Sequence, residues 1–214
     1  MPDPPLRICL MSMAYPPHQY EGVGRHTNLM AQGLFELGHT VHVITRGDKD
    51  AVSFYDGAYV HPIQYQCERY NQYRIYPRLD NSLNYSHAAY DRVRQLMLND
   101  GIQVVDTPLW QMDGLVTAVS NTIPVALRLQ TATKQITDIQ REQSTDARLL
   151  GDMEQKLIQQ AHYLVPNSQA TLTAVQKVYD VQPTPDVTPS SRMVLFQLKM
   201  KRFGPFPCKI RPTP

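Results

Sequence analysis

Two glycines and an arginine stand close together near the start of the chain, in the segment Gly22-Val23-Gly24-Arg25. Glycine has no Cβ atom, so a ligand can approach the backbone closely where it stands. The first turn of a helix presents unpaired N–H groups and a partial positive charge, which together bind phosphate. The segment therefore predicts an anion site, with Arg25 adding charge. The alternative is a tight strand-to-helix turn followed by a solvated arginine, because a lone G-x-G pattern is a weak signal.

The elements around these glycines have the pattern of an α/β domain. Residues 8–13 form a short apolar run, as expected of a strand covered by helices on both faces. Apolar side chains at helical spacing follow Gly24, and Gly38 is positioned to end that helix. A second strand is predicted at residues 41–44. This order of strand, loop, helix and strand predicts a doubly wound, mostly parallel sheet.

A nicotinamide or flavin site is disfavoured by two residues of the same stretch. Thr27 stands where the third glycine of a G-x-G-x-x-G fingerprint is expected. The second strand ends at Thr45-Arg46, with no acidic residue to bind a ribose. A dinucleotide-dependent oxidoreductase is therefore the weakest of the functional hypotheses.

One further predicted strand ends next to a residue that can bind a ligand. Trp110 follows the strand at residues 102–106. Open α/β sheets collect their ligands at the carboxyl ends of the strands, so we expect Trp110 at that edge of the sheet. Trp110 could instead wedge a helix against the sheet. Another buried strand is predicted at residues 124–129, and Gln130 after it could simply lead into a helix.

The rest of the folded part is predicted from periodicity. Helices are expected at residues 82–99 and 147–161, and a third helix is capped by Ser168. Short strands are expected at residues 58–65 and 162–166. The fold class is α/β, a Rossmann-like three-layer domain.

The pattern AYPP-x4-GVGRHT-x6-GL-x3-GHTVHVIT resembles the N-terminal domain of family-4-like retaining glycosyltransferases, which have the GT-B fold. The closing motif V-x-x-S, residues 165–168, resembles the same family. The resemblance implies that this chain is one half of a GT-B fold, the half that mainly holds the acceptor. It also implies that the chain ends before the C-terminal donor domain.

The resemblance assigns roles to the candidate residues. Gly22, Val23, Gly24 and Arg25 would bind the diphosphate or sugar of the donor, although Glu21 stands where the family usually has its first glycine. The residues implied on the acceptor wall are Trp110 and Asp113. Gln130, the candidate catalytic residue, takes the place of a family histidine and would contact the sugar without shuttling a proton. A nucleotide sugar would be the co-substrate, with no cofactor and no metal.

Composition excludes several other classes. The three cysteines, Cys9, Cys67 and Cys208, have neither disulfide nor metal-site spacing, and no signal peptide or membrane-spanning run is present. These features predict a cytoplasmic protein. Residues 1–182 carry 15 Lys+Arg and 18 Asp+Glu, so a basic nucleic-acid-binding face is not expected.

The last part of the chain differs from the rest. Residues 182–214 contain seven prolines, a strong excess of basic residues and no usable periodicity. We expect a glycosyltransferase family-4-like domain at residues 1–181, followed by an irregular Pro-rich basic tail at residues 182–214. A change of reading frame would produce such a break, and so would a natural linker. In either case the isolated chain is expected to be inactive, because the cationic groups that stabilise the departing diphosphate would be missing.

The second functional hypothesis is a non-catalytic binding or regulatory module, or a separately encoded half that pairs with a C-terminal donor domain. Its acceptor could be a sugar, a lipid or a small molecule, and a lipid acceptor would imply peripheral membrane contact. An uncovered domain face would favour self-association.

Overall fold

Seven strands form one sheet in the computed structural model, which describes residues 4–17, 22–48, 51–65, 75–179 and 181. The strand order is β3-β4-β2-β1-β5-β6-β7, and every neighbouring pair is parallel except β3 with β4. The strands are β1 (Arg7–Met11), β2 (Thr40–Arg46), β3 (Ser53–Tyr55), β4 (Ala58–Ile63), β5 (Val104–Pro108), β6 (Val125–Leu129) and β7 (Tyr163–Pro166). The predicted α/β class and mostly parallel sheet are confirmed.

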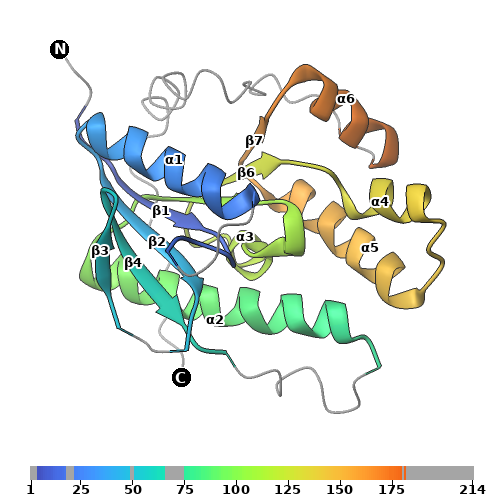
Figure 1. The fold of residues 1–214 in the computed structure, drawn as a ribbon, viewed down its shortest axis with the longest axis horizontal. Coiled ribbons are helices and arrows are strands. Elements are labelled where there is room, and N and C mark those ends of the chain that lie inside the picture. The colour runs from blue at the N-terminus through green and yellow to red at the C-terminus, as the bar shows by residue number, and fades with distance from the viewer. Residues whose placement is uncertain (1–3, 18–21, 49–50, 66–74, 180, 182–214) are drawn as a thin grey trace.

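Helices cover the two faces of the sheet and make it the middle of three layers (Figure 1). They are α1 (Gly22–Glu36), α2 (Pro77–Asn99), η1 (Trp110–Met112), α3 (Leu115–Ser120), α4 (Thr133–Gln140), α5 (Thr145–Gln160) and α6 (Gln169–Val178). Helix α1 lies on one face, and α2 with α3 lies on the other.

Alternating side chains of β1 reach both faces. Ile8 and Leu10 belong to the apolar cluster under α1, whereas Cys9 and Met11 belong to the cluster under α2. All four side chains are buried. Because β1 is covered by helices on both faces, its sequence is a continuous apolar run, and the prediction of a buried strand here is confirmed.

The order of the strands creates one switch point in the sheet. From β1 the chain adds β2 and β4 on one side, and it then returns to place β5 on the other side of β1. The connections that leave the carboxyl ends of β1 and β5 therefore diverge, and a crevice opens between them. This crevice is where a ligand site is expected.

The structure differs from the sequence-based prediction at several boundaries. Strand β3 was not predicted; it forms a hairpin with β4 through Asp56-Gly57, both in the left-handed region at φ 46° and 84°. Helix α4 was also not predicted. Helix α2 begins at Pro77 rather than residue 82, because a proline is well suited to the first turn. Glu21 and the tail at 182–214 lie outside the described residues, so the domain boundary at residue 181 stays a prediction.

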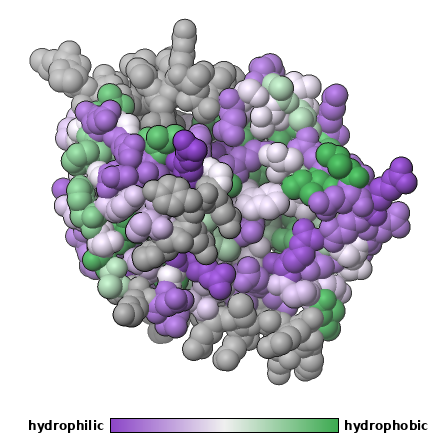
Figure 2. Space-filling model, in the orientation of Figure 1, coloured by the Kyte–Doolittle hydropathy of each residue, from purple (hydrophilic) through white to green (hydrophobic). Residues whose placement is uncertain are grey.

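The visible surface is mostly hydrophilic, with apolar side chains in small patches (Figure 2). One exposed aromatic cluster joins Phe35 to Phe54 and Phe54 to Tyr59, with ring centroids 5.9 and 5.2 Å apart. It lies at the amino ends of β2 and β4, opposite the crevice. Among the described residues, no helix is both long enough and apolar enough to cross a membrane.

The position of Gly24 corrects the interpretation of the glycine motif. Gly22 and Gly24 lie inside the first turn of α1 rather than in a loop before it. A Cβ atom on Gly24 would clash with the carbonyl oxygen of Ala14, whereas a Cβ on Gly22 would meet none of the described residues within 4 Å. Gly24 therefore lets the helix pack against the backbone that follows β1, and only Gly22 is open to a ligand.

We expect the substitution Gly24→Ala to lower the free energy of unfolding by about 1–3 kcal/mol, because the added methyl group overpacks against the Ala14 carbonyl. The measurement is urea unfolding followed by circular dichroism. Gly33→Ala is the matched control in the same helix, since its Cβ would meet nothing within 4 Å. This control should raise stability by about 0.5–1 kcal/mol. Equal effects of the two substitutions would contradict the packing role of Gly24.

Candidate functional site

A cavity of about 190 Å³ lies at the crevice between the ends of β1 and β5. We call it the β1–β5 cavity. Its walls come from the carboxyl ends of three strands, from the first turn of α1, from α2 and from the η1 segment. The lining residues are Ser12, Met13, Ala14, Val23, Arg46, Asn81, Pro108, Trp110, Gln111 and Asp113. The wall is largely polar, so the cavity suits a ligand that makes hydrogen bonds.

Asp113 is the buried acidic group of this cavity, with 2% of its surface exposed. Its Oδ2 accepts a hydrogen bond from the backbone N–H of Met13 at 2.9 Å. Its Oδ1 is buried and has no hydrogen-bond partner among the described residues. Burial raises the pKa of Asp113 to about 7, although the Met13 N–H and the charge of Arg128 oppose the rise.

An unusual backbone turn precedes Asp113. Gln111 and Met112 have φ values of 58° and 57°, in the left-handed region that side chains other than glycine rarely adopt. Such conformations cost of order 1–3 kcal/mol each and collect at ligand sites. Because Gln111 and Asp113 both line the cavity, the strained turn forms part of its wall.

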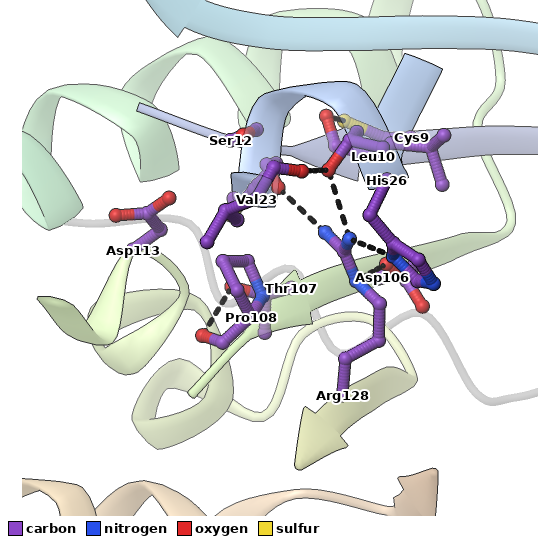
Figure 3. Close-up of polar contacts among 12 residues, drawn as sticks. Cys9, Leu10, Ser12, Val23, His26, Asp106, Thr107, Pro108, Asp113 and Arg128 are labelled. Atoms are coloured by element: carbon purple, nitrogen blue, oxygen red, sulfur yellow. Dashed lines mark hydrogen bonds and ion pairs between the residues drawn. The ribbon is translucent and has the colours of Figure 1, made fainter. Parts of the chain in front are cut away.

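A buried arginine holds the elements around the cavity together. Arg128 of β6 is 1% exposed, and its Nε lies 2.6 Å from Oδ1 of Asp106 on β5. Its Nη2 donates to the carbonyl oxygen of Met11 at the end of β1, at 2.9 Å, and its Nη1 donates to Oγ1 of Thr27 in α1, at 2.8 Å. Figure 3 shows the guanidinium reaching from β6 toward the first turn of α1, with Asp113 standing apart from this group. One cation therefore fixes two neighbouring strands and the start of α1.

His26 completes the arginine cluster. Nη1 of Arg128 lies 3.4 Å from Nδ1 of His26 and donates to it. Burial lowers the pKa of His26, and the nearby charge of Arg128 lowers it further. His26 is therefore neutral, with its proton on Nε2, where it can act as a hydrogen-bond donor at the start of α1.

The structure brings three of the predicted site residues together. Val23, Trp110 and Asp113 line the β1–β5 cavity. Gly22 and Arg25 are exposed on the first turn of α1 and do not line it.

The other two predicted residues lie outside the cavity. Gly24 is buried against Ala14 and offers no open backbone. Gln130 follows β6, and its Oε1 is buried without a hydrogen-bond partner among the described residues. The first turn of α1, the cavity and Gln130 therefore mark one edge of the sheet.

Sequence reasoning did not find Arg128, Asp106 or His26. A signal was present, because Arg128 interrupts the buried strand sequence VALRL, and a charge in such a strand requires a partner. Asp106, in the middle of the neighbouring buried strand β5, is that partner. Within the described residues, no group of three or more histidine, cysteine or acidic side chains is placed to hold a metal ion.

The profile of the family described as Glycosyltransferase Family 4 matches residues 20–188. The match covers more than half of the chain, and the chain therefore belongs to this family. Among curated proteins, none matches the sequence.

Solved structures of glycosyltransferases share the fold at low sequence identity. Sucrose-phosphate synthase from Thermosynechococcus elongatus superposes with a TM-score of 0.65 at 14% identity, over 86% of this chain and 48% of the other. Phytolacca americana UGT2, solved with UDP-2fluoro-glucose and pterostilbene, superposes with a TM-score of 0.55 at 10% identity, over 87% of this chain and 53% of the other. This chain thus spans about half the length of the structures it resembles, and it has the architecture of one half of a GT-B fold.

We expect Arg128→Met to lower the free energy of unfolding by about 3–5 kcal/mol, because the substitution leaves the buried Asp106 without its partner. Adding Asp106→Leu should recover part of the loss, since the double variant buries no charge at this place. Urea unfolding of the two variants measures the coupling.

Arg78→Met is the matched control for Arg128→Met. Arg78 forms an ion pair with Glu142 at 2.8 Å, but its side chain is 47% exposed. Its removal should change stability by no more than about 1 kcal/mol. If Arg128→Met and Arg78→Met lower the free energy of unfolding by similar amounts, burial of the ion pair between Arg128 and Asp106 does not explain the loss.

Asp113 predicts a pH dependence of stability. The pKa of about 7 in the folded protein lies above the ordinary value of 3.8, so the fold favours the protonated acid. The stability from this group is complete below about pH 4 and is lost as the pH rises through 7, by up to about 1.4 kcal/mol per pH unit. Asp113→Asn does not titrate, and it should raise the melting temperature more at pH 8 than at pH 5. A difference that is constant across this range would contradict the raised pKa.

Proposed function

We propose that this chain is the acceptor-side half of a retaining glycosyltransferase, which transfers a sugar from a nucleotide-sugar donor to an acceptor. The observation that carries the proposal is the β1–β5 cavity, because it lies at the switch point of a family-4 domain. The acceptor would lie in this cavity, with Trp110 and Asp113 in its wall.

The donor would bind at the first turn of α1. Gly22 is exposed and has open space around it, and Arg25 is an exposed cation three residues later. The N–H groups of this turn point away from the helix and suit a diphosphate. UGT2 was solved with UDP-2fluoro-glucose, which supports a nucleotide sugar as the co-substrate here. We expect no metal in this proposal. Gln130 would contact the transferred sugar through its buried amide.

The isolated chain would be inactive in this proposal. A departing diphosphate needs cationic groups that strengthen their contacts in the transition state. Arg128 cannot serve, because Asp106 neutralises it and its other N–H groups bind Met11 and Thr27. The missing cations would come from a C-terminal domain, in keeping with the twofold greater length of the matching structures.

A non-catalytic binding module is the second candidate function. The observation that favours it is Gln130, since an amide cannot shuttle a proton where the family has a histidine. Such a module would hold an acceptor or pair with a separately encoded donor half. We propose a cytoplasmic location for either function, and self-association or peripheral membrane contact would follow from an uncovered face or a lipid acceptor.

Nucleotide binding at α1 is the test of the proposed function. We expect UDP, ADP or GDP to shift the amide signals of residues 22–26 in nitrogen-15 NMR spectra, with saturation. Gly22→Glu should weaken this binding about tenfold or more, or about 1.4 kcal/mol, because it adds a carboxylate beside the phosphates. The position tolerates a side chain, since nothing lies within 4 Å of its Cβ.

Gly33→Glu serves as the control for Gly22→Glu, because Gly33 is in the same helix and is equally open. The chain without a partner should transfer no sugar from the common nucleotide sugars. Amide signals that stay unchanged with all three nucleotides would contradict the donor site. If the wild-type chain transfers sugar and the Gly22→Glu variant does not, the activity belongs to this chain, and the expected inactivity of the isolated half is wrong.

A further inference from the structure

The carboxylate of Asp113 is only half used by the protein. Oδ2 accepts the Met13 N–H, whereas Oδ1 is buried in the wall of the β1–β5 cavity with no partner among the described residues. An unpaired buried oxygen of a carboxylate is costly, and native proteins rarely retain one without a reason. The strained turn at Gln111 and Met112 adds a further cost at the same wall.

Four of the donors near Asp113 have other contacts, while the side-chain amides of Asn81 and Gln111 and the indole N–H of Trp110 belong to the same cavity wall. Arg128 is bound to Asp106, Met11 and Thr27, and the hydroxyl of Ser12 donates to the Ala14 carbonyl at 2.6 Å. The hydroxyl of Tyr85 donates to the Ile44 carbonyl at 3.4 Å, and the guanidinium of Arg46 lies 5.4 Å from the Tyr65 ring. The donor that completes Oδ1 is therefore expected from the contents of the cavity, which are water in the free protein and a ligand in the complex.

The chemistry of the wall restricts that ligand. A buried carboxylate attracts a hydroxyl and repels an anion. A volume of about 190 Å³ is smaller than the roughly 300–1,000 Å³ of pockets that take drug-sized ligands, so the cavity suits a single small ring. Trp110 adds an apolar ring surface, and such a surface packs well against the C–H face of a sugar.

We propose that Asp113 is a specificity-determining residue, whose Oδ1 accepts a hydrogen bond from a hydroxyl group of a neutral sugar ring held in the β1–β5 cavity. This inference rests on the proposed function and names the class of acceptor for the same site. Asp113 selects for a hydroxyl at one ring position and excludes an anionic group there. Trp110 positions the ring, and Met13 fixes the carboxylate through its N–H.

The test uses the nitrogen-15-labelled chain at pH 8 and follows the Met13 amide, which donates to Asp113. The probes are glucose, galactose, mannose, fructose and myo-inositol, with inorganic phosphate as the anionic comparison. We expect at least one neutral ring to shift the Met13 signal with saturation, and phosphate to leave it unchanged. Asp113→Asn should weaken the binding about tenfold or more, since a charge-assisted hydrogen bond is lost.

Two control variants test whether Asp113 itself binds the sugar ring. Asp138→Asn, at an exposed position on α4, should leave the affinity unchanged. Trp110→Ala should weaken binding of the ring in the wild-type and Asp113→Asn backgrounds alike.

A wild-type titration at pH 5 repeats the test without a substitution. Protonation of Asp113 should weaken binding there, and Asp113→Asn should show no such pH effect. The groups that face Asp113 are Arg128 of β6, Tyr85 of α2 and Arg46 of β2. Arginine side chains stay protonated in this range, and burial holds the pKa of Tyr85 well above it.

Each remaining outcome overturns the inference. If Asp113→Asn binds the ring as tightly as the wild type, Asp113 only supports the backbone of Met13. If phosphate shifts the Met13 signal and no neutral ring does, the cavity is an anion site. If no probe binds while nucleotides still shift the signals of residues 22–26, the acceptor class is wrong and the proposed function stands. If neither the rings nor the nucleotides bind, the proposed function fails as well.

Discussion

The buried contact between Arg128 and Asp106 is the interaction on which the rest of the site depends. The contact joins β6 to β5 at 2.6 Å, and the same guanidinium reaches the end of β1 and Thr27 of α1. A buried ion pair is a weak source of net stability, because desolvation offsets most of the attraction. It is a strong source of specificity here, since an arginine with four fixed partners tolerates only one placement of the strands and the helix. Loss of either partner leaves a charge that nothing else in the cluster can satisfy.

The position of α1 follows from this constraint and from close packing. Gly24 brings the first turn of α1 against the Ala14 carbonyl, and Thr27, one turn later, accepts from Arg128. The helix start is thus held on one side by backbone contact and on the other by a charged hydrogen bond. Val23 precedes both contacts, accepts a hydrogen bond from the Thr27 hydroxyl through its carbonyl oxygen and lines the β1–β5 cavity, and Gly22 is exposed at the end of the helix. The separation of the β1–β5 cavity from the exposed start of α1 is therefore a result of packing.

Most of the fold could be predicted because its strands are buried on both faces and its helices have one apolar side. The hairpin at β3 and β4 could not, since three residues carry too little periodicity for a strand to be assigned. The site was predictable in part. Trp110 was found by its position after a central strand, and Asp113 was found by the resemblance to the family. Arg128 was missed because its partners are distant in sequence, with Asp106 lying 22 positions earlier. The sequence alone could not separate the roles of the two glycines. Gly24 allows α1 to pack against the Ala14 carbonyl, whereas Gly22 has no described residue within 4 Å of the position of a Cβ atom.

The polar groups of this edge of the sheet fall into two kinds. Around Glu154, donors and acceptors are matched; Glu154 accepts from the backbone N–H and the hydroxyl of Thr133 and from the hydroxyl of Tyr179, which ties α4, α5 and the end of α6 together. At Asp113 and Gln130, by contrast, a buried oxygen has no partner among the described residues. Asn84 in α2 and Thr117 in α3 also have a buried oxygen without a hydrogen-bond partner among the described residues, so position distinguishes Asp113 and Gln130: both follow the carboxyl end of a strand, where α/β sheets collect ligands. Donors that arrive with a ligand would complete these two acceptors, and their positions, one after β5 and one after β6, lie at the carboxyl edge of the sheet beside the switch point between β1 and β5.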